Sequence, residues 1–398
     1  MMNSVPRCSL RWRVVGGAIL AGMCLIARLA VAGTGNHYVV TNDDSTGNYI
    51  QNSVSVYRVG ADGQLTFEKK IDIGVTGAAG GYFPANRVVT LDTTNNQCIF
   101  ASNAATGQIA GIDSTFTVRT LVKGSSTDTG LSNGVGLAVN GQYLYASFTD
   151  NSAIGTFQVG TDCGLSFLGD TTVGGLQGGV IDGMAVHGNL LIATYGDGSI
   201  ESFSVSSGMP VSNGDKQNSS AYGASQGASY PSGIDITQDG HFAIFGDTST
   251  TVSVEVSDIS SGQLTATKIY QTGISINSSN IILSPDETLL YAVDTQGDRV
   301  SAAFFDKTTG VLSHGCSSNL ISGYSQNWSY LAGLAMATNS GTGGEIYVAE
   351  FGAPSSIAEI QITSVGGRCS LQEASGSPIA DPNSRGLLSI ASFPPRGF

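Results

Sequence analysis

The fold is decided by the segment Asn280-Ile-Ile-Leu-Ser-Pro-Asp-Glu-Thr-Leu-Leu-Tyr-Ala-Val-Asp294, in which two short apolar runs flank a polar turn. Two further runs of alternating character follow it, at 299–306 and around 309–313. Short runs with a two-residue period, bounded by turn residues, are typical of antiparallel strands. The segment and its continuation therefore predict one four-stranded β-unit.

The same unit recurs along the chain, with further copies beginning near Val88, Asn133, Ile181, Ser232 and Ala332. The ends of the second strands superimpose at seven positions, which are Asn42, Asn103, Phe148, Tyr195, Asp247, Asp294 and Glu350. Their mean spacing is about 51 residues, close to the length of a four-stranded propeller blade. We therefore expect an all-β fold, a single seven-bladed β-propeller of four-stranded antiparallel blades.

The first copy begins abruptly at Tyr38-Val-Val-Thr-Asn42 and lacks a leading strand. Near the end of the chain, Gly386-Leu-Leu-Ser-Ile-Ala391 has the character of such a strand. Closing a ring leaves no sheet edge exposed to other chains. We therefore predict that this C-terminal strand completes blade one and closes the ring.

The composition excludes several other classes of protein. Glycine accounts for 54 of the 398 residues and only 12% of the residues are charged. Aromatic residues, Val and Ile are plentiful and the glycines have no three-residue period, which excludes a disordered chain and a collagen. Leu, Lys, Arg and Glu are too scarce for a coiled coil. A turn-rich β protein with a substantial core remains.

The N-terminal residues have the pattern of a secretory signal peptide. Three arginines between positions 7 and 13 precede an apolar stretch that ends in Ala30-Val-Ala32, as a basic start, a hydrophobic middle and a small-residue cleavage site require. We predict a signal peptide at 1–32 and a propeller domain at 33–398, with the mature protein secreted, periplasmic or at the cell surface. An uncleaved anchor is the alternative, because the stretch approaches membrane-spanning length. After cleavage we expect no membrane span and a monomer.

The charge restricts the partners. The chain has 17 basic and 30 acidic residues, a formal net charge of −13. Cleavage after residue 32 removes four arginines and no acid, so the mature chain would carry 13 basic residues and a net charge of −17. A field of that sign repels nucleic acid and disfavours phosphorylated substrates. We therefore expect no nucleic-acid partner.

Four cysteines remain after the predicted cleavage, namely Cys98, Cys163, Cys316 and Cys369. An even number in an exported chain is compatible with two disulfides in any of three pairings. No pair has C-x-x-C spacing, so zinc has no support. We expect at least one disulfide and leave the pairing open.

Three phrases resemble the YVTN-type repeats of the seven-bladed lactonase-like propellers, namely Tyr38-Val-Val-Thr-Asn42, Asn52-Ser-Val-Ser-Val-Tyr57 and Leu283-Ser-Pro-Asp-Glu-Thr-Leu-Leu-Tyr291. This superfamily includes 6-phosphogluconolactonases, muconate-lactonising enzymes and exported repeat proteins. The resemblance covers nearly all of the mature chain. It implies the fold, whereas the activity follows from the particular site that each member carries.

The sequence departs from the enzyme pattern of that superfamily. Lactonase members often carry a Pro-Arg-His-like step before a leading strand, and a basic cleft for a phosphorylated lactone. Here the corresponding step is Tyr230-Pro-Ser-Gly233, without Arg or His. Together with the negative charge, this departure argues against 6-phosphogluconolactone and leaves an unphosphorylated lactone, or no reaction, open.

The strand ends give the candidate site. Asp247, Asp294 and Glu350 occupy one equivalent position in three adjacent blades, on the face where we expect ligands to collect around the channel. Clustered carboxylates bind a hard cation such as calcium, or raise one another's pKa for acid–base catalysis. Asp182 would add a fourth carboxylate. The alternative is structural, because Asn and Asp side chains also satisfy the backbone groups of turns.

Ligand contacts are predicted at the remaining positions of this face. Phe148 and Tyr195 would give the channel an aromatic wall for a sugar or lactone ring, beside Asn42 and Asn103. Trp328 lies on the loop that enters blade seven and is a candidate lid residue. Core packing is the alternative for this tryptophan.

Three functions agree with the sequence. The first is an exported module that binds a carbohydrate, a protein or a surface component at the channel face. The second is a lactone hydrolase or cycloisomerase, with Asp247, Asp294 or Glu350 as general base and no cofactor apart from calcium. The third is a structural envelope component without a small ligand. The sequence favours binding by a narrow margin, because the face is acidic and poor in histidine.

Overall fold

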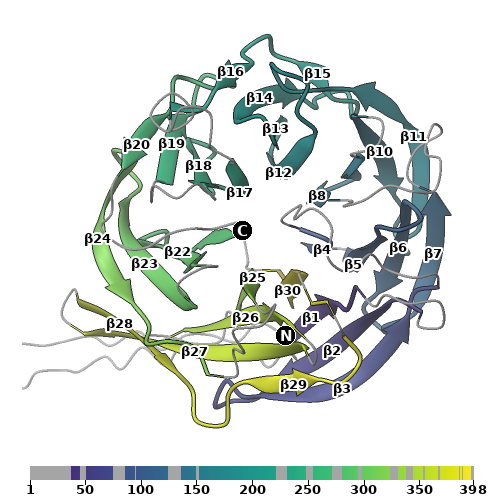
Figure 1. Cartoon of the computed structure of the whole chain (residues 1–398). Helices are drawn as coiled ribbons and strands as arrows, with labels where there is room; N and C mark the ends of the chain where they lie inside the picture. Colours follow the sequence, from purple (N-terminus) through teal and green to yellow (C-terminus); the bar gives the residue numbers. More distant parts are fainter. Residues whose placement is uncertain are drawn as a thin grey trace, which may run out of the picture. The chain divides into compact units, whose positions relative to one another are not determined.

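The computed structural model describes residues 37–44, 51–74, 86–94, 96–123, 136–148, 152–220, 231–247, 254–270, 280–294, 298–322, 330–337, 344–352, 355–365, 368–384, 386–387 and 389–395. The chain divides between Gly33 and Thr34, and the predicted signal peptide lies outside the described residues. The described part forms seven antiparallel sheets arranged in a ring (Figure 1). The predicted all-β seven-bladed propeller is confirmed.

Each blade is a sheet whose strands run in order from the ring axis outward. Blades one to three consist of β30 (Ser389–Phe393), β1 (Tyr38–Asn42), β2 (Ser53–Val59) and β3 (Leu65–Asp72); β4 (Val88–Thr93), β5 (Asn96–Asn103), β6 (Gln108–Asp113) and β7 (Val118–Lys123); and β8 (Gly136–Asn140), β9 (Tyr143–Phe148), β10 (Ala153–Val159) and β11 (Leu165–Thr172).

In blades four and seven, two short segments share the outermost position. Blades four to seven consist of β12 (Ile181–His187), β13 (Leu190–Tyr195), β14 (Ser199–Ser204), β15 (Val211–Ser212) and β16 (Gln217–Asn218); β17 (Pro231–Ile236), β18 (Phe242–Asp247), β19 (Val254–Asp258) and β20 (Lys268–Tyr270); β21 (Ile281–Leu283), β22 (Leu289–Asp294), β23 (Arg299–Asp306) and β24 (Val311–Ser317); and β25 (Tyr330–Ala337), β26 (Glu345–Phe351), β27 (Ser355–Val365), β28 (Arg368–Glu373) and β29 (Ile379–Asp381).

The ring closes through the C-terminal strand, as predicted. β30 pairs antiparallel with β1, with Phe393 opposite Tyr38 and Ser389 opposite Asn42 (Figure 1). The strand lies a few residues closer to the C-terminus than the predicted segment at 386–391. Because β30 takes the innermost position, β1 is paired on both sides.

The core lies between the blades. Seven clusters of buried apolar side chains each join two neighbouring blades. Successive residues of a strand point to opposite faces of its sheet. Val39 therefore packs with Tyr347 of blade seven, whereas Val40 packs with Ile99 of blade two. Side chains of the second strands thus point sideways toward neighbouring blades, which matters for the predicted site.

Two disulfides join neighbouring blades, so the expectation of at least one is confirmed. Cys98 of β5 bonds to Cys163 in the turn between β10 and β11, and Cys316 of β24 bonds to Cys369 of β28. The first bridge brings the backbones of blades two and three close together. An added Cβ at Gly111 would lie 2.1 Å from the carbonyl oxygen of Cys163, so only glycine fits there.

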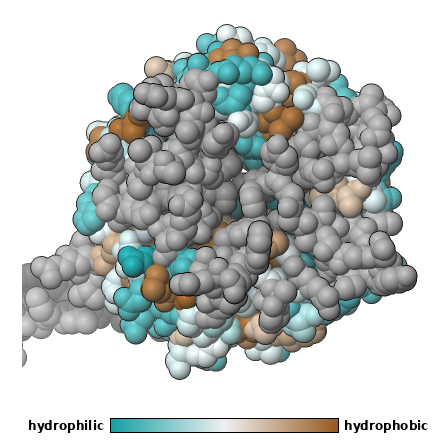
Figure 2. All heavy atoms as spheres, viewed as in Figure 1, coloured by the Kyte–Doolittle hydropathy of each residue, from teal (hydrophilic) through white to brown (hydrophobic). Residues whose placement is uncertain are grey.

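The surface of the described part is mixed in character. Figure 2 shows hydrophobic residues on one face separated by hydrophilic ones. Exposed large apolar side chains include Phe67, Leu168 and Val211 on the outermost strands of three different blades. Single apolar side chains of this kind are normal on a surface. The described residues also contain no helix that is long and apolar enough to cross a bilayer.

Candidate functional site

The strand ends lie where the sequence analysis expects them. Six predicted positions are the last residues of second strands, and Glu350 comes one residue before the end of β26. These strands, with their predicted final residues, are β1 (Asn42), β5 (Asn103), β9 (Phe148), β13 (Tyr195), β18 (Asp247) and β22 (Asp294). The direction of the described side chains differs from the expectation, because they point between blades.

Asn42 and Asn103 are fully buried at the junction of blades one and two. The Asn42 amide donates to the carbonyl oxygens of Arg87 (3.0 Å) and Ser102 (2.7 Å). Asn52 donates to the side-chain oxygens of both residues, at 2.9 Å each. These amides are therefore committed to joining two blades, as in the structural alternative considered for the strand ends.

Phe148 and Tyr195 are also buried, with exposed fractions of 1% and 0%. Phe148 packs in the cluster between blades two and three, and Tyr195 packs between blades three and four. The Tyr195 hydroxyl donates to Glu201 Oε2 (2.8 Å). The two rings thus form no exposed wall in this structure, because the alternation of side chains along each strand turns them into the packing between blades.

Glu350 faces blade six, in line with its strand neighbour Val348. It is 5% exposed and accepts a hydrogen bond from the Ser356 hydroxyl, while its Oε1 has no hydrogen-bond partner among the described residues. Burial raises the pKa of Glu350 to about 7. The negative charges of Glu373 and Asp298 add to this rise, and the hydrogen bond from Ser356 opposes it.

The other two members of the predicted carboxylate group end β18 and β22, but the side chains of Asp247 and Asp294 lie outside the described residues. Trp328 also lies outside them. Among the described side chains, no three His, Cys, Asp or Glu residues lie close enough together to hold a metal ion. The calcium site therefore stays a prediction.

Asp182 is a predicted site residue whose side chain the structure describes. It lies at the start of β12, the innermost strand of blade four, as the extra residue of a β-bulge between Ile181 and Gly183. Bulges re-aim side chains and are common beside active sites. No hydrogen bond reaches its carboxyl from the described residues. Burial, reinforced by the charge of Asp197, raises the pKa of Asp182 to about 7.

Asp197, in the adjacent turn between β13 and β14, has the opposite character. Its carboxylate accepts backbone hydrogen bonds from Gln177 (2.7 Å), Gly179 (3.1 Å) and Ser199 (3.1 Å) and a further one from the Ser199 hydroxyl. Burial opposes ionisation, but these bonds hold the pKa of Asp197 below its ordinary value. Two neighbouring carboxyls with pKa values pushed apart are typical of an acid–base site.

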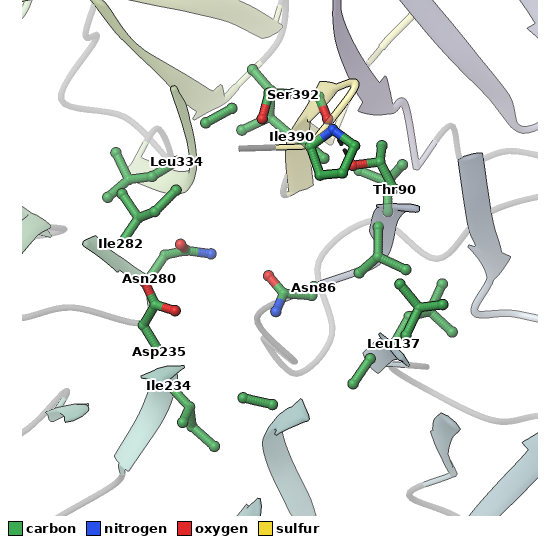
Figure 3. Close-up of a pocket in the computed structure, with 18 of the residues that line it drawn as sticks. Asn86, Thr90, Leu137, Ile234, Asp235, Asn280, Ile282, Leu334, Ile390 and Ser392 are labelled. Atoms are coloured by element: carbon green, nitrogen blue, oxygen red, sulfur yellow. Dashed lines mark hydrogen bonds between the residues drawn. The ribbon is translucent and has the colours of Figure 1, made fainter. Parts of the chain in front are cut away.

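The innermost strands enclose a cavity of about 230 Å³ on the ring axis. All seven blades contribute to its wall, which is mainly apolar (Figure 3). Asn86 and Asn280, which precede β4 and β21, point toward each other across it (Figure 3). Met184 of β12 lines the cavity two residues after Asp182. The carboxyl thus lies on the strand that leads into the cavity.

Sequence reasoning found Asp182 but missed the partners that define its chemistry. Asp197 lies in Gly196-Asp197-Gly198, which is a readable turn signal. Its neighbour Gly196 lies against Asp182, because an added Cβ there would lie 3.2 Å from Asp182 Oδ2. Asn86 and Asn280 lie just before innermost strands, so a search of those positions in every blade would have found them.

Comparisons with known proteins support the fold. No protein-family model and no curated protein matches the sequence. Among solved structures, it is similar to a proposed 6-phosphogluconolactonase from Bacteroides fragilis, with 15% identity, 90% of this chain and 99% of that chain covered and a TM-score of 0.66. It is also similar to the periplasmic gluconolactonase of Pseudomonas aeruginosa, with 14% identity, 90% and 99% coverage and a TM-score of 0.63.

A third similar structure is a protein of unknown function from Desulfotomaculum acetoxidans, with 13% identity, 89% and 98% coverage and a TM-score of 0.61. The chain therefore shares its propeller fold with these structures, as the resemblance to lactonase-like propellers implies. At this identity the likeness concerns the fold.

Proposed function

We propose that the protein is a hydrolase of unphosphorylated lactones, with Asp182 as its acid–base group. The observation that carries the proposal is the pair formed by Asp182 and Asp197. The raised pKa of Asp182, about 7, lets it exist in both protonation states near neutral pH, whereas Asp197 stays ionised. A general acid–base catalyst works best when its pKa lies near the working pH.

The reaction needs one group that takes and returns a proton. Ionised Asp182 accepts a proton from water as the water oxygen bonds to the lactone carbonyl carbon. The tetrahedral intermediate then breaks the ring C–O bond, and Asp182 returns the proton to the leaving oxygen. The product is a hydroxy acid, which ionises and releases one proton to the solution.

Two further observations support this choice. Two of the similar structures are described as lactonases, one of them periplasmic. The net charge of −13 disfavours a phosphorylated substrate. The periplasmic neighbour and the N-terminal sequence pattern together favour an exported enzyme, so we propose that it works outside the cytoplasm.

The proposal is tested by titrating the acid released from a panel of unphosphorylated lactones. Asp182→Asn should abolish hydrolysis, whereas Asp162→Asn, which removes a charge from an exposed turn, should leave it unchanged. In the wild-type protein, kcat/KM should rise as the pH passes through about 7. Hydrolysis of no lactone by the folded protein would refute the proposal.

Asp197→Asn gives a sharper test of the same pair. Removing the charge of Asp197 lowers the pKa of Asp182, so the rising limb of the pH profile should move to lower pH. The introduced asparagine keeps one acceptor oxygen, so it can accept the bonds from Ser199 or those from Gln177 and Gly179, but not both sets. If the rising limb of the pH profile stays in place, a group other than Asp182 controls it. Glu350, whose pKa is also raised to about 7, is then the first group to examine.

Binding without turnover is the second candidate, because the cavity on the ring axis can hold a ligand without any acid–base group. A carbohydrate, protein or surface component at the channel face fits this role. In that case, lactones or sugars should raise the melting temperature of wild-type and Asp182→Asn proteins equally, and the pH-stat should record no acid release.

A further inference from the structure

The axial cavity suggests what kind of lactone the site takes, an inference that rests on the proposed function. Asp182 and Met184 lie on one strand, two residues apart, and Met184 lines the cavity. A strand rises about 3.3 Å per residue, so the cavity wall begins about 7 Å from Asp182 along the strand. If the lactone ring of a substrate lies at Asp182, the first few atoms of a chain attached to that ring therefore reach the cavity.

The wall of this cavity is apolar where a ligand would touch it. The half-buried aliphatic side chains along the wall are Val89, Val139, Ala185, Val186, Ile282 and Ala391.

Two of the polar side chains along the wall are committed to the backbone. Asp235 accepts hydrogen bonds from the amides of Ile236 (2.9 Å) and Leu283 (2.7 Å), and the Thr90 hydroxyl donates to the Ser392 carbonyl (2.7 Å). The interior thus favours a hydrocarbon over a sugar.

The polar residues of the wall are also unevenly placed along the axis. Asn86 and Asn280 precede the first residues of β4 and β21, at the same end of the innermost strands as Asp182. At the other end, Pro395 follows β30 and lines both this cavity and an adjoining hollow of about 460 Å³. The two amide side chains therefore lie at the end of the cavity near Asp182, and beyond them the wall is apolar apart from Thr90, Asp235 and Ser392.

We propose that the substrate is a lactone with an unbranched apolar chain, which lies in the axial cavity while the ring lies at Asp182. Burying one methylene group is worth about 0.8 kcal/mol, which corresponds to an approximately fourfold change in an equilibrium constant. Each added methylene should therefore raise kcat/KM up to about fourfold until the cavity is full. A neutral tail also suits a protein whose charge disfavours anionic substrates.

The test is a series of γ-lactones whose alkyl chains lengthen from one carbon to about nine. We expect kcat/KM to rise with chain length and then level off. Ala185→Leu narrows the cavity that Ala185 lines, so it should lower the ratio of kcat/KM for the longest chain to that for the shortest. Leu168→Ala, on an outermost strand, is the matched control and should leave this ratio unchanged. If Ala185→Leu does not fold, Ile282→Phe fills the same cavity from blade six.

A second series separates this inference from the proposed function. The corresponding alkyl lactams resist hydrolysis, so their effect on the melting temperature reports binding alone. Hydrolysis of the lactones at rates independent of chain length would overturn the inference and leave the lactonase proposal standing. Absence of hydrolysis, with lactam stabilisation that grows with chain length, would overturn the lactonase proposal and retain the apolar cavity as a binding site. Absence of both effects would overturn both.

Discussion

The junction of blades one and two and the mouth of blade four, which is formed by Asp182 and Asp197, both place Asn or Asp side chains beside strand ends but bond them differently. At the junction, Asn42, Asn52 and Asn103 are fully buried and hydrogen-bonded to one another and to the backbone. At the mouth, Asp197 is equally well bonded, but Asp182 beside it has no hydrogen bond within the described part of the chain. The polar groups of the first region hold two blades together, whereas the carboxyl of Asp182 in the second region makes no such bond.

The same contrast extends to charge. Next to the asparagines, Arg87 and Asp44 form a fully buried ion pair at 3.0 Å. At the mouth, the charge that faces Asp182 is another negative one. An opposite charge compensates burial, whereas a like charge adds to its cost and raises the pKa of the acid. The Arg87–Asp44 pair and the Asp182–Asp197 pair therefore differ in the sign of the charge that faces the buried carboxyl.

The largest effect is expected from removing the C-terminal strand, which supports the first region. Ser389 of β30 accepts hydrogen bonds from the amides of Arg87 (3.0 Å) and Val88 (3.1 Å), and Ile390 and Phe393 lie in the core. Deleting 385–398 should lower the melting temperature by about 15 °C or more, because several buried apolar side chains are lost. Deleting only 396–398 is the control, and equal melting of both proteins would disprove closure by β30.

A smaller loss is expected from breaking the buried ion pair. Arg87→Met leaves Asp44 buried without its cation, which should cost about 3–5 kcal/mol of unfolding free energy. Replacing both residues, as Arg87→Met with Asp44→Asn, should restore part of that loss because no charge stays buried and asparagine tolerates the left-handed backbone of position 44. Denaturant unfolding of the single and double variants measures the difference. A double variant less stable than either single one would contradict this account of the junction.

The architecture could be predicted from the sequence, because each blade repeats the same pattern of strands and turns. The spacing of strand ends predicts seven blades, and the missing first strand at Tyr38 predicts closure by the C-terminal segment. For the candidate site, the sequence predicted which residues end the second strands but not the direction of their side chains. Which face of a sheet a strand-end residue takes depends on its parity along the strand, and this parity places Phe148 and Tyr195 between blades. The β-bulge at Asp182 cannot be recognised from a single sequence.

The pH dependence of stability tests the second region. Asp182 has a folded pKa of about 7, raised above its ordinary value, so its contribution to stability is complete at low pH and is lost as the pH rises through 7. Asp182→Asn removes this loss. The stability of the variant relative to wild type should increase by up to about 1.4 kcal/mol per pH unit between about pH 4 and 7 and then stay level. Urea unfolding at several pH values measures it.

Asp162→Asn is the matched control, because Asp162 is exposed in the turn between β10 and β11. Its stability difference from wild type should change little over the same range. A parallel rise in both variants would mean that the net charge of the protein, and not the surroundings of Asp182, causes the effect.

The smallest effect is expected from Gly196→Ala, which changes the surroundings of Asp182 without changing any charge. The added methyl group would lie 3.2 Å from Asp182 Oδ2, so the carboxyl must shift by a few tenths of an ångström. A methyl group in this place also excludes water from the carboxyl, and desolvation raises the pKa of an acid. The midpoint of the pH profile for Asp182 should therefore move upward, opposite to its movement in Asp197→Asn. If both substitutions move it downward, loosening of the turn explains them, and the charge of Asp197 does not set the pKa of Asp182.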